Sequence, residues 1–398
     1  MARGQTDTRP GVRGLWFPRM TVADWVRGLS NRLTGQSVDP VQALIARGKE
    51  YSESGLHADA AASYQDALHI SPQHAEAHHG LGLAWRDLQR FDDAAASYRR
   101  AVAIRPAYIE AHNNLGVVLQ LQGKLRAALA CYRDAVDLEP DFPQPNLNLG
   151  RLCVILKDHP QAARCYRNAL ARGLDPDLFG HLLNAITGTA SRRAPAGYAR
   201  IVFDEFAAHF DERLVVGLGY RMPELLGNRV REHTAGTGLR ALDLGCGTGL
   251  CGKEIAACCS YLMGVDLSHV MLERARSRNV YHEFAEQDIE DYLLTVPALG
   301  FDAVLAADVF IYIGDLAALF TGVDRTLTRG GIFAFSIEHA GEESDYTLQS
   351  TGRYAHSLQY VRRLAALQQW HEIEASSQTM RRNSDGATDG RLIVMTKH

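Results

Sequence analysis

Residues 241–252 read ALDLGCGTGLCG, and this stretch contains two overlapping glycine patterns. Gly245, Gly247 and Gly249 form G-x-G-x-G, which is typical of sites for S-adenosylmethionine (SAM). Gly247, Gly249 and Gly252 form G-x-G-x-x-G, which is typical of sites for nicotinamide or flavin dinucleotides. Both patterns occur where the first strand of an α/β sheet turns into its first helix, so the stretch indicates one fold class under either interpretation.

Predicted strands and helices alternate from residue 239 onward. Apolar stretches with the length of strands are separated by helical sequences such as CGKEIAACC and SHVMLERARSR. These strands are LRALDLG (239–245), YLMGVDL (261–267), a third strand within YHEFAEQD (281–288), FDAVLAADVF (301–310), GGIFAFSIE (330–338) and LIVMTKH (392–398). Such alternation predicts a doubly wound, Rossmann-like α/β domain that binds ligands at the carboxyl ends of its strands.

Acidic residues distinguish the two nucleotides. Asp243 stands two residues before Gly245, where a carboxylate can bind the ammonium group of SAM directly or through water. In the dinucleotide frame Asp243 would lie inside a buried strand without a partner, which is costly. Asp266 and Asp288 follow at later strand ends, where they can reach the ribose hydroxyls and the adenine amino group. Three carboxylates suit a cationic nucleoside better than a pyrophosphate, so the predicted cofactor is SAM.

The predicted SAM site also includes the neighbours of these carboxylates. Ile289 is expected to lie against the adenine ring, and Asp308 follows the fourth strand. The predicted cofactor-binding residues are Asp243, Gly245, Cys246, Gly247, Gly249, Asp266, Leu267, Asp288, Ile289 and Asp308. No metal site is predicted, because His78, His79 and His112 lack metal-ligand spacing within one helix.

The first half of the chain repeats itself every 34 residues. A glycine, two alanines and a tyrosine recur in four successive units, and a proline closes three of them. The recurring residues are Gly48, Gly82, Gly116 and Gly150, Ala60, Ala94, Ala128 and Ala162, Tyr64, Tyr98, Tyr132 and Tyr166, Ala67, Ala101, Ala135 and Ala169, and Pro72, Pro106 and Pro140. This period is typical of the tetratricopeptide repeat (TPR), a pair of helices. We predict repeats at 41–74, 75–108, 109–142 and 143–176.

These patterns divide the chain into four segments. A basic N-terminal segment covers 1–40, and an all-α TPR superhelix with a capping helix covers 41–187. A linker rich in Gly, Ser, Ala and Pro covers 188–199, and the α/β domain covers 200–398. The basic segment could form an amphipathic helix for a membrane or an acidic partner, but Gly28 at its middle favours a short helix that caps the repeats.

The TPR array is expected to bind a protein or peptide partner along its inner face. Asn114 and Asn148 occupy the same inner-face register one repeat apart, where amides can hydrogen-bond a peptide backbone, as in TPR proteins with an asparagine ladder. Ala46 and Gly80 hold the equivalent places in the first two repeats. The alternative, that both asparagines are solvated polar residues, therefore stays open.

Composition argues against several classes of function. The net charge of −4 provides no global field for nucleic acid. The fourth strand is followed by AADVF rather than a [DN]-P-P-[FYW] motif, and no Pro-Cys dipeptide occurs, so no nucleic-acid acceptor is predicted. No apolar run approaches the roughly 20 residues of a transmembrane helix. Seven scattered cysteines without a C-x-x-C pair indicate reduced thiols and a cytoplasmic location.

Residues 239–338 resemble a class I SAM-dependent methyltransferase, and 200–398 resemble bacterial predicted methyltransferases that carry TPR repeats. The resemblance is carried by FDEFAAHFDERLV, LDLGCGTGL, GVDLS, FDAVLAADVFIYIGDL, GGIFAFSIE and GRYAHSLQYV. It implies a sheet ordered 3-2-1-4-5-7-6 with an antiparallel strand seven. The chain departs from the family at AALQQWH (365–371), where such enzymes usually show a Gly-Phe pair.

Methyl transfer from SAM depends mainly on aligning a nucleophile with the S–CH3 bond and excluding water. A general base is needed only for a hydroxyl or ammonium acceptor. The candidate catalytic residues are Tyr312, after the fourth strand, and His339 and His356, after the fifth. Each histidine could instead be a hydrogen-bonded structural residue.

The sequence therefore predicts a SAM-dependent methyltransferase that acts on a small or carrier-bound metabolite, with the TPR array docking a partner. One alternative is a protein methyltransferase whose TPR groove presents the peptide substrate. A second alternative is a TPR scaffold whose α/β domain senses SAM or is inactive.

Overall fold

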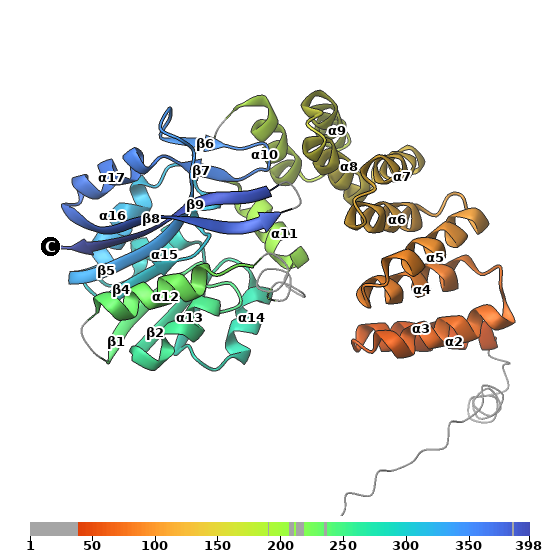
Figure 1. Cartoon of the computed structure of the whole chain (residues 1–398), viewed down its shortest axis with the longest axis horizontal. Helices are drawn as coiled ribbons and strands as arrows, with labels where there is room; N and C mark the ends of the chain where they lie inside the picture. The colour runs from red at the N-terminus through yellow and green to blue at the C-terminus, as the bar shows by residue number, and fades with distance from the viewer. Residues whose placement is uncertain (1–38, 190, 207–210, 212–218, 235–236, 384–385) are drawn as a thin grey trace, which may run out of the picture. The chain divides into compact units, whose positions relative to one another are not determined.

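The computed structural model describes residues 39–189, 191–206, 211, 219–234, 237–383 and 386–398. The described residues form two compact units that divide between Leu138 and Glu139 (Figure 1). The predicted basic segment lies outside the described residues except for its last two positions.

Helix pairs form the described part of the first unit. The pairs are α2 (Pro40–Glu53) with α3 (His57–Ile70), α4 (Ala75–Asp87) with α5 (Phe91–Ile104), and α6 (Ile109–Leu121) with α7 (Leu125–Leu138). Each pair coincides with one predicted repeat, which confirms the TPR architecture.

The recurring glycines and tyrosines explain how closely these helices pack. A Cβ added at Gly82 would lie 2.6 Å from the ring of Tyr98, which is fully buried, so only glycine leaves room for that ring. Gly80 lies against Tyr64 of the preceding repeat, and an added Cβ would lie 2.5 Å from its ring. This close contact explains why the second repeat has no side chain at the register of Asn114.

Two histidines of the repeats have structural partners. His78 Nε2 lies 3.0 Å from the carbonyl oxygen of Pro72, and His112 Nε2 lies 2.8 Å from that of Pro106. Each histidine thus bonds to the proline that closes the preceding repeat, which gives both a structural role.

The second unit begins with helices of the repeat type. α8 (Pro143–Ile155) and α9 (His159–Ala171) form the fourth predicted repeat, and α10 (Pro176–Thr187) is the predicted capping helix. The boundary between the compact units, after Leu138, therefore falls inside the repeat array.

The predicted linker is docked on the α/β domain, not a free connection. The carbonyl of Arg192 accepts hydrogen bonds from the N–H groups of Gly314 and Asp315 at 2.9 and 2.8 Å. The N–H of Ala194 donates to the carbonyl of Tyr312 at 2.8 Å. The following helix, α11 (Ala196–Phe206), begins before the predicted linker ends. The segment whose composition marks the predicted boundary is thus bonded through its backbone to residues 312–315.

The sheet has the order β3-β2-β1-β4-β5-β9-β8. Its strands are β1 (Leu239–Leu244), β2 (Cys259–Asp266), β3 (Glu283–Glu286), β4 (Phe301–Ala306), β5 (Leu327–Glu338), β8 (Trp370–Asn383) and β9 (Gly386–Lys397). β1 to β5 pair in parallel, and β9 is antiparallel to both β5 and β8. A separate hairpin of β6 (Tyr346–Leu348) and β7 (Tyr354–His356) was not predicted. Without that hairpin the order is the expected 3-2-1-4-5-7-6, which confirms the predicted fold.

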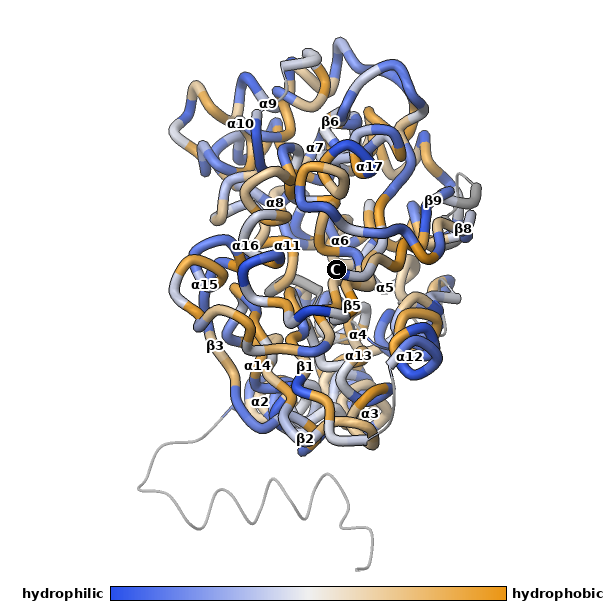
Figure 2. Tube along the Cα trace, turned by 90° about the vertical axis from the view of Figure 1, so that its left-hand side faces the viewer, coloured by the Kyte–Doolittle hydropathy of each residue, from blue (hydrophilic) through white to orange (hydrophobic). Residues whose placement is uncertain are grey.

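Helices cover both faces of the sheet (Figure 1). α12 (Met222–His233) and α13 (Leu250–Ile255) share one core with the sheet, whereas α15 (Ile289–Thr295), α16 (Ala317–Thr326) and α17 (Leu358–Leu367) share the other. α14 (His269–Ser277) lies beside β2 and β3. The hydropathy of α12 alternates along its turns, because it buries Met222, Leu226 and Val230 and exposes charged residues (Figure 2). This packing brings the turns after β1, β2, β3 and β4 to one edge.

Candidate functional site

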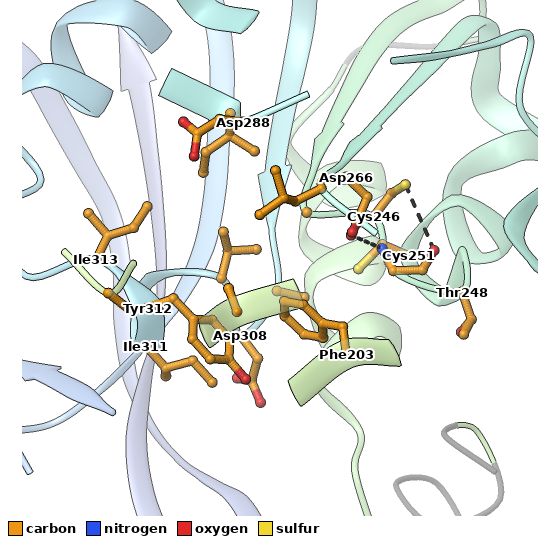
Figure 3. Close-up of a pocket in the computed structure, with 18 of the residues that line it drawn as sticks. Phe203, Cys246, Thr248, Cys251, Asp266, Asp288, Asp308, Ile311, Tyr312 and Ile313 are labelled. Carbon is orange, nitrogen blue, oxygen red and sulfur yellow. Dashed lines mark hydrogen bonds between the residues drawn. The ribbon is translucent and has the colours of Figure 1, made fainter. Parts of the chain in front are cut away.

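A cavity lies at the carboxyl ends of the parallel strands, where ligands are expected in this fold (Figure 3). In this view Asp288 lies above, Cys246 and Asp266 lie to the right, and Tyr312 and Asp308 lie below. Eight of the ten predicted cofactor-binding residues line the cavity: Gly245, Cys246, Gly247, Asp266, Leu267, Asp288, Ile289 and Asp308. Asp243 and Gly249 are not part of this lining.

The glycine turn is held by the carboxylate of Asp266. Gly245, Gly247 and Gly249 have φ of 65°, 53° and 85°, a left-handed conformation that glycine adopts without strain. Asp266 is 4% exposed; its Oδ2 accepts from the N–H of Gly247 at 2.8 Å and its Oδ1 from the N–H of Ser268 at 2.9 Å. The end of β2 and the turn after β1 are thus fixed to each other before any ligand binds.

Asp243 has a protein partner that the sequence analysis missed. It lies inside β1, is 1% exposed, and its Oδ2 accepts a hydrogen bond from Tyr281 Oη at 2.6 Å. The expectation that a carboxylate at this place in the strand lacks a partner is therefore wrong. Burial raises the pKa of Asp243 to about 7, although the hydrogen bond from Tyr281 opposes the shift.

Gly252, the last glycine of the dinucleotide pattern, has a packing role. A Cβ added there would lie 2.3 Å from Cζ of Tyr281, and its N–H donates to Tyr281 Oη at 3.1 Å. The third glycine therefore makes room for the tyrosine that bonds to Asp243, so the G-x-G-x-x-G pattern is explained without a pyrophosphate.

Asp288 is paired with an arginine from the predicted linker. Arg193 Nη2 donates to Asp288 Oδ2 at 2.7 Å, and Arg193 Nη1 donates to Glu290 Oε2 at 2.9 Å. Asp288 also caps α15 by accepting from the N–H of Glu290 at 3.0 Å. Arg193 lines the cavity, and its placement in a supposed linker concealed it from the sequence analysis.

Asp308 and Tyr312 form the opposite side of the cavity. Asp308 has a φ of 56°, and its Oδ1 lies 3.2 Å from Ser336 Oγ on β5. Tyr312 ends a short 3-10 turn, η4 (Phe310–Tyr312), and its ring meets that of Phe203 edge-on at 5.0 Å. Tyr312 is thus the candidate catalytic residue that the structure brings to the cavity.

The structure does not bring His339 or His356 to the cavity lining. His356 is fully buried, and its Nε2 lies 2.8 and 3.1 Å from the carbonyl oxygens of Ile313 and Gly314. Since carbonyls only accept, this nitrogen carries a proton and donates. Burial lowers the pKa of His356 to about 4. His339 pairs with His356 in a backbone bridge. The hydrogen-bonded structural role is thus the one that the geometry supports for His356.

Two further charged residues form an ion pair beside Tyr312 and Asp308. Arg353, just before β7, lines it, and Glu338, at the end of β5, is 2% exposed. Arg353 Nη1 lies 3.9 Å from Glu338 Oε1. Arg353 lies in the GRYAHSLQYV motif, from which the sequence analysis took His356 as a candidate but not Arg353. Among the described residues, no group of three or more His, Cys, Asp and Glu side chains is placed to hold a metal ion.

Family models match both halves of the chain. A model for the methyltransferase domain matches residues 242–335, and models for tetratricopeptide repeats match 84–123 and 109–142.

Curated relatives match the α/β half. The malonyl-[acyl-carrier protein] O-methyltransferase of Legionella pneumophila is 30% identical over 131 residues, which cover 31% of this chain and 45% of that protein. The ubiquinone biosynthesis O-methyltransferase of Xylella fastidiosa is 27% identical over 148 residues, which cover 34% of this chain and 59% of that protein. The chain thus spans about half the length of these relatives.

The solved structures that match this chain include the magnesium protoporphyrin IX methyltransferase from Synechocystis with bound SAH. It is 16% identical, with a TM-score of 0.39, and the match covers 50% of this chain and 98% of that one. The chain therefore combines tetratricopeptide repeats with a domain of the methyltransferase family.

Proposed function

We propose that this chain is a SAM-dependent methyltransferase that acts on a small or carrier-bound metabolite. The observation that carries the proposal is the row of carboxylates in one cavity: Asp266 after the second strand, Asp288 after the third and Asp308 after the fourth, beside a left-handed glycine turn. A cationic nucleoside fits such a row better than a pyrophosphate does, because the carboxylates attract its charge.

Asp266 and Asp288 of this row, together with the buried Asp243, hold SAM under this proposal. Asp266 accepts the ribose hydroxyls with the lone pairs that its backbone bonds leave over. Asp288, oriented by Arg193, accepts the adenine amino group, and Ile289 packs against the ring. Asp243 is ionised when SAM is bound, and its negative charge attracts the ammonium group of SAM across the glycine turn. When bound, SAM supplies a methyl group on a sulfonium, which is already an activated electrophile.

The protein's part in the reaction is alignment and the exclusion of water. Phe203, Ile311 and Ile313 give this part of the cavity apolar walls. Among the described residues that line the cavity there is no histidine or lysine to serve as a base. An acceptor that reacts as an oxygen anion needs none, and Tyr312 or Asp308 is the group placed to move a proton for a hydroxyl acceptor.

The relatives support a metabolite over a protein as the acceptor. The names of the two curated relatives give an acyl-carrier-bound acid and a ubiquinone precursor pathway, and both describe O-methylation. The alternative of a protein methyltransferase whose groove presents a peptide has no such support. The second alternative, a sensing or inactive domain, predicts SAM binding without turnover.

The TPR array is proposed to dock a protein partner or the carrier, with Asn114 and Asn148 among its contacts. The amide nitrogen of Asn114 lies 2.9 Å from His79 Nε2, and that of Gln144 lies 3.3 Å from Asn148 Oδ1. We place the protein in the cytoplasm; no described helix is both long and apolar enough to cross a bilayer.

Calorimetry with SAM, S-adenosylhomocysteine (SAH) and NAD tests the cofactor. Tight binding of the first two, with none of NAD, supports the proposal, and the reverse refutes it. Cell lysate incubated with SAM labelled in its methyl group and then separated into protein and small molecules tests the acceptor. Label in small molecules or on an acyl carrier supports a metabolite, label on other proteins supports the first alternative, and no transfer despite binding supports the second.

A further inference from the structure

We infer that Arg353 binds a carboxylate group of the methyl acceptor. This inference rests on the proposed function, because it assigns the acceptor side of the same cavity.

Arg353 lies on the side of the cavity that the residues proposed to bind SAM do not line. Its electrostatic neighbours are Tyr312, Glu338, Tyr198 and Asp308. Glu338 ends β5 and Asp308 follows β4, whereas the residues proposed for the nucleoside follow β1, β2 and β3. A group bound by Arg353 therefore approaches from β4 and β5, opposite the nucleoside.

The guanidinium of Arg353 has donors to offer a ligand. Within the described part of the chain its ion-pair partner is Glu338, and the 3.9 Å between Nη1 and Oε1 is too long for a hydrogen bond. The side chain is 32% exposed and lines the cavity. Arg193, the other positively charged residue in the described lining, is already bonded to Asp288 and Glu290. Arg353 is therefore the cation available for an anionic ligand.

The backbone that carries Arg353 is fixed from several directions. His181 of the capping helix α10 places Nε2 2.8 Å from the carbonyl oxygen of Gly352. Gly352 has a φ of 83°, and a Cβ added there would lie 2.6 Å from Tyr198 Oη. The carbonyl of Arg353 itself accepts from the N–H of Gln349 at 2.8 Å. Because this loop is ordered before binding, a ligand does not have to supply the cost of ordering it.

Local charge selects a monoanion with an apolar body. The carboxylates of Glu338 and Asp308 lie near the guanidinium and would repel a phosphate dianion more strongly than a carboxylate. A planar carboxylate also matches the two parallel N–H groups of a guanidinium. The remaining wall is aromatic and aliphatic, with Phe203, Tyr312 and Ile311. The acceptor class is therefore an apolar or aromatic monocarboxylate.

The test uses the full-length protein saturated with SAH. The binding of weakly bound probe molecules is measured by ligand-observed NMR titration. The probes are benzoate and hexanoate, each with its neutral amide, benzamide and hexanamide, and phenyl phosphate as a dianion. The proteins are wild type, Arg353→Gln, Arg353→Lys and Arg363→Gln. Arg363 is a matched control, since it is 53% exposed on α17 and pairs with Asp345.

We expect both carboxylates to bind wild type more tightly than their amides. Arg353→Gln should weaken carboxylate binding by about tenfold or more, as expected for a lost charged hydrogen bond, and leave amide binding unchanged. Arg353→Lys should lie between, because an ammonium keeps the charge but not the planar fork. Arg363→Gln should match wild type. Unchanged affinity of Arg353→Gln for SAH shows that the variant keeps its cavity.

Several results overturn the inference. Carboxylates that bind wild type and Arg353→Gln equally, or do not bind wild type, remove the role of Arg353. Tighter binding of phenyl phosphate than of benzoate refutes the acceptor class. If Arg353→Gln loses affinity for SAH but not for methylthioadenosine, which lacks the amino-acid part, Arg353 binds the cofactor's carboxylate instead. If wild type does not bind SAH, the proposed function fails first, and the inference falls with it.

Discussion

Replacing Asp243 by Asn should remove a large pH dependence of stability in the second unit. The carboxyl is 1% exposed, and its pKa rises from 3.8 to about 7. This shift of about three pH units corresponds to about 4 kcal/mol at 1.36 kcal/mol per unit. Between the two pKa values the folded state binds a proton that the unfolded state lacks, so the free energy of unfolding falls as pH rises and levels off above about pH 7.

The measurement is urea unfolding at pH 5, 6, 7 and 8, followed by near-ultraviolet circular dichroism. The Phe320–Trp370 pair, with ring centroids 5.3 Å apart, contributes to this signal from the core of the sheet. The free energy of unfolding of Asp243→Asn minus that of wild type should increase by about 3 kcal/mol between pH 5 and pH 8, because Asn cannot ionise. An Asn oxygen can still accept from Tyr281, so any other effect is a constant offset.

Asp291→Asn, which removes an exposed carboxylate from α15, is the matched control and should run parallel to wild type. Parallel profiles for Asp243→Asn and wild type would refute the reasoning, since the buried carboxyl would then not be the titrating group. Binding adds a second readout. If Asp243 contributes to holding the ammonium of the cofactor, the variant loses affinity for SAH but keeps its affinity for methylthioadenosine.

Three further substitutions test the site. Gly252→Ala places a Cβ 2.3 Å from Tyr281 and should lower the free energy of unfolding in urea by about 1–3 kcal/mol. The control Gly300→Ala, whose added Cβ would lie 3.5 Å from the nearest atom, should lower it much less. Equal losses would show that Tyr281 moves freely. Arg193→Gln removes the partner that orients Asp288 and should weaken SAH binding about tenfold in calorimetry. The control Arg192→Gln, at a side chain that is 74% exposed, should leave SAH binding unchanged. Equal SAH affinities of the two variants would mean that Asp288 does not need Arg193 to orient it. His356→Phe removes two buried hydrogen bonds and should lower the free energy of unfolding by about 1–3 kcal/mol. It should not abolish methyl transfer in labelled lysate. Loss of methyl transfer with intact SAH binding would indicate that His356 is the catalytic base.

Features with a local sequence pattern could be predicted. The 34-residue period arises because each repeat packs its helices in the same way, so the recurrence of Gly82 and Tyr98 in the sequence indicates that the two residues are in contact. The strand order followed from the family resemblance. The turn at Gly245–Gly249 needs glycine because the backbone there is left-handed.

Contacts between distant residues could not be predicted from one sequence. Tyr281 bonds to Asp243, 38 residues away, and Arg193 to Asp288, 95 residues away, and neither tyrosine nor arginine carries a local signal of such a partner. His356 shows the opposite error, because its residue type suggested proton transfer while its burial against two carbonyls could be seen only in three dimensions.

The hydrogen bond from His181 to Gly352 makes the capping helix α10 a support of the cavity wall that carries Arg353. A fragment cut at residue 200, the seam that composition suggests, would lose His181, Arg193 and Ala194 together and leave the Arg353 loop and Asp288 without their supports. The boundary between the compact units lies between Leu138 and Glu139, so a fragment designed to keep the cavity intact should begin there and include α8, α9 and α10.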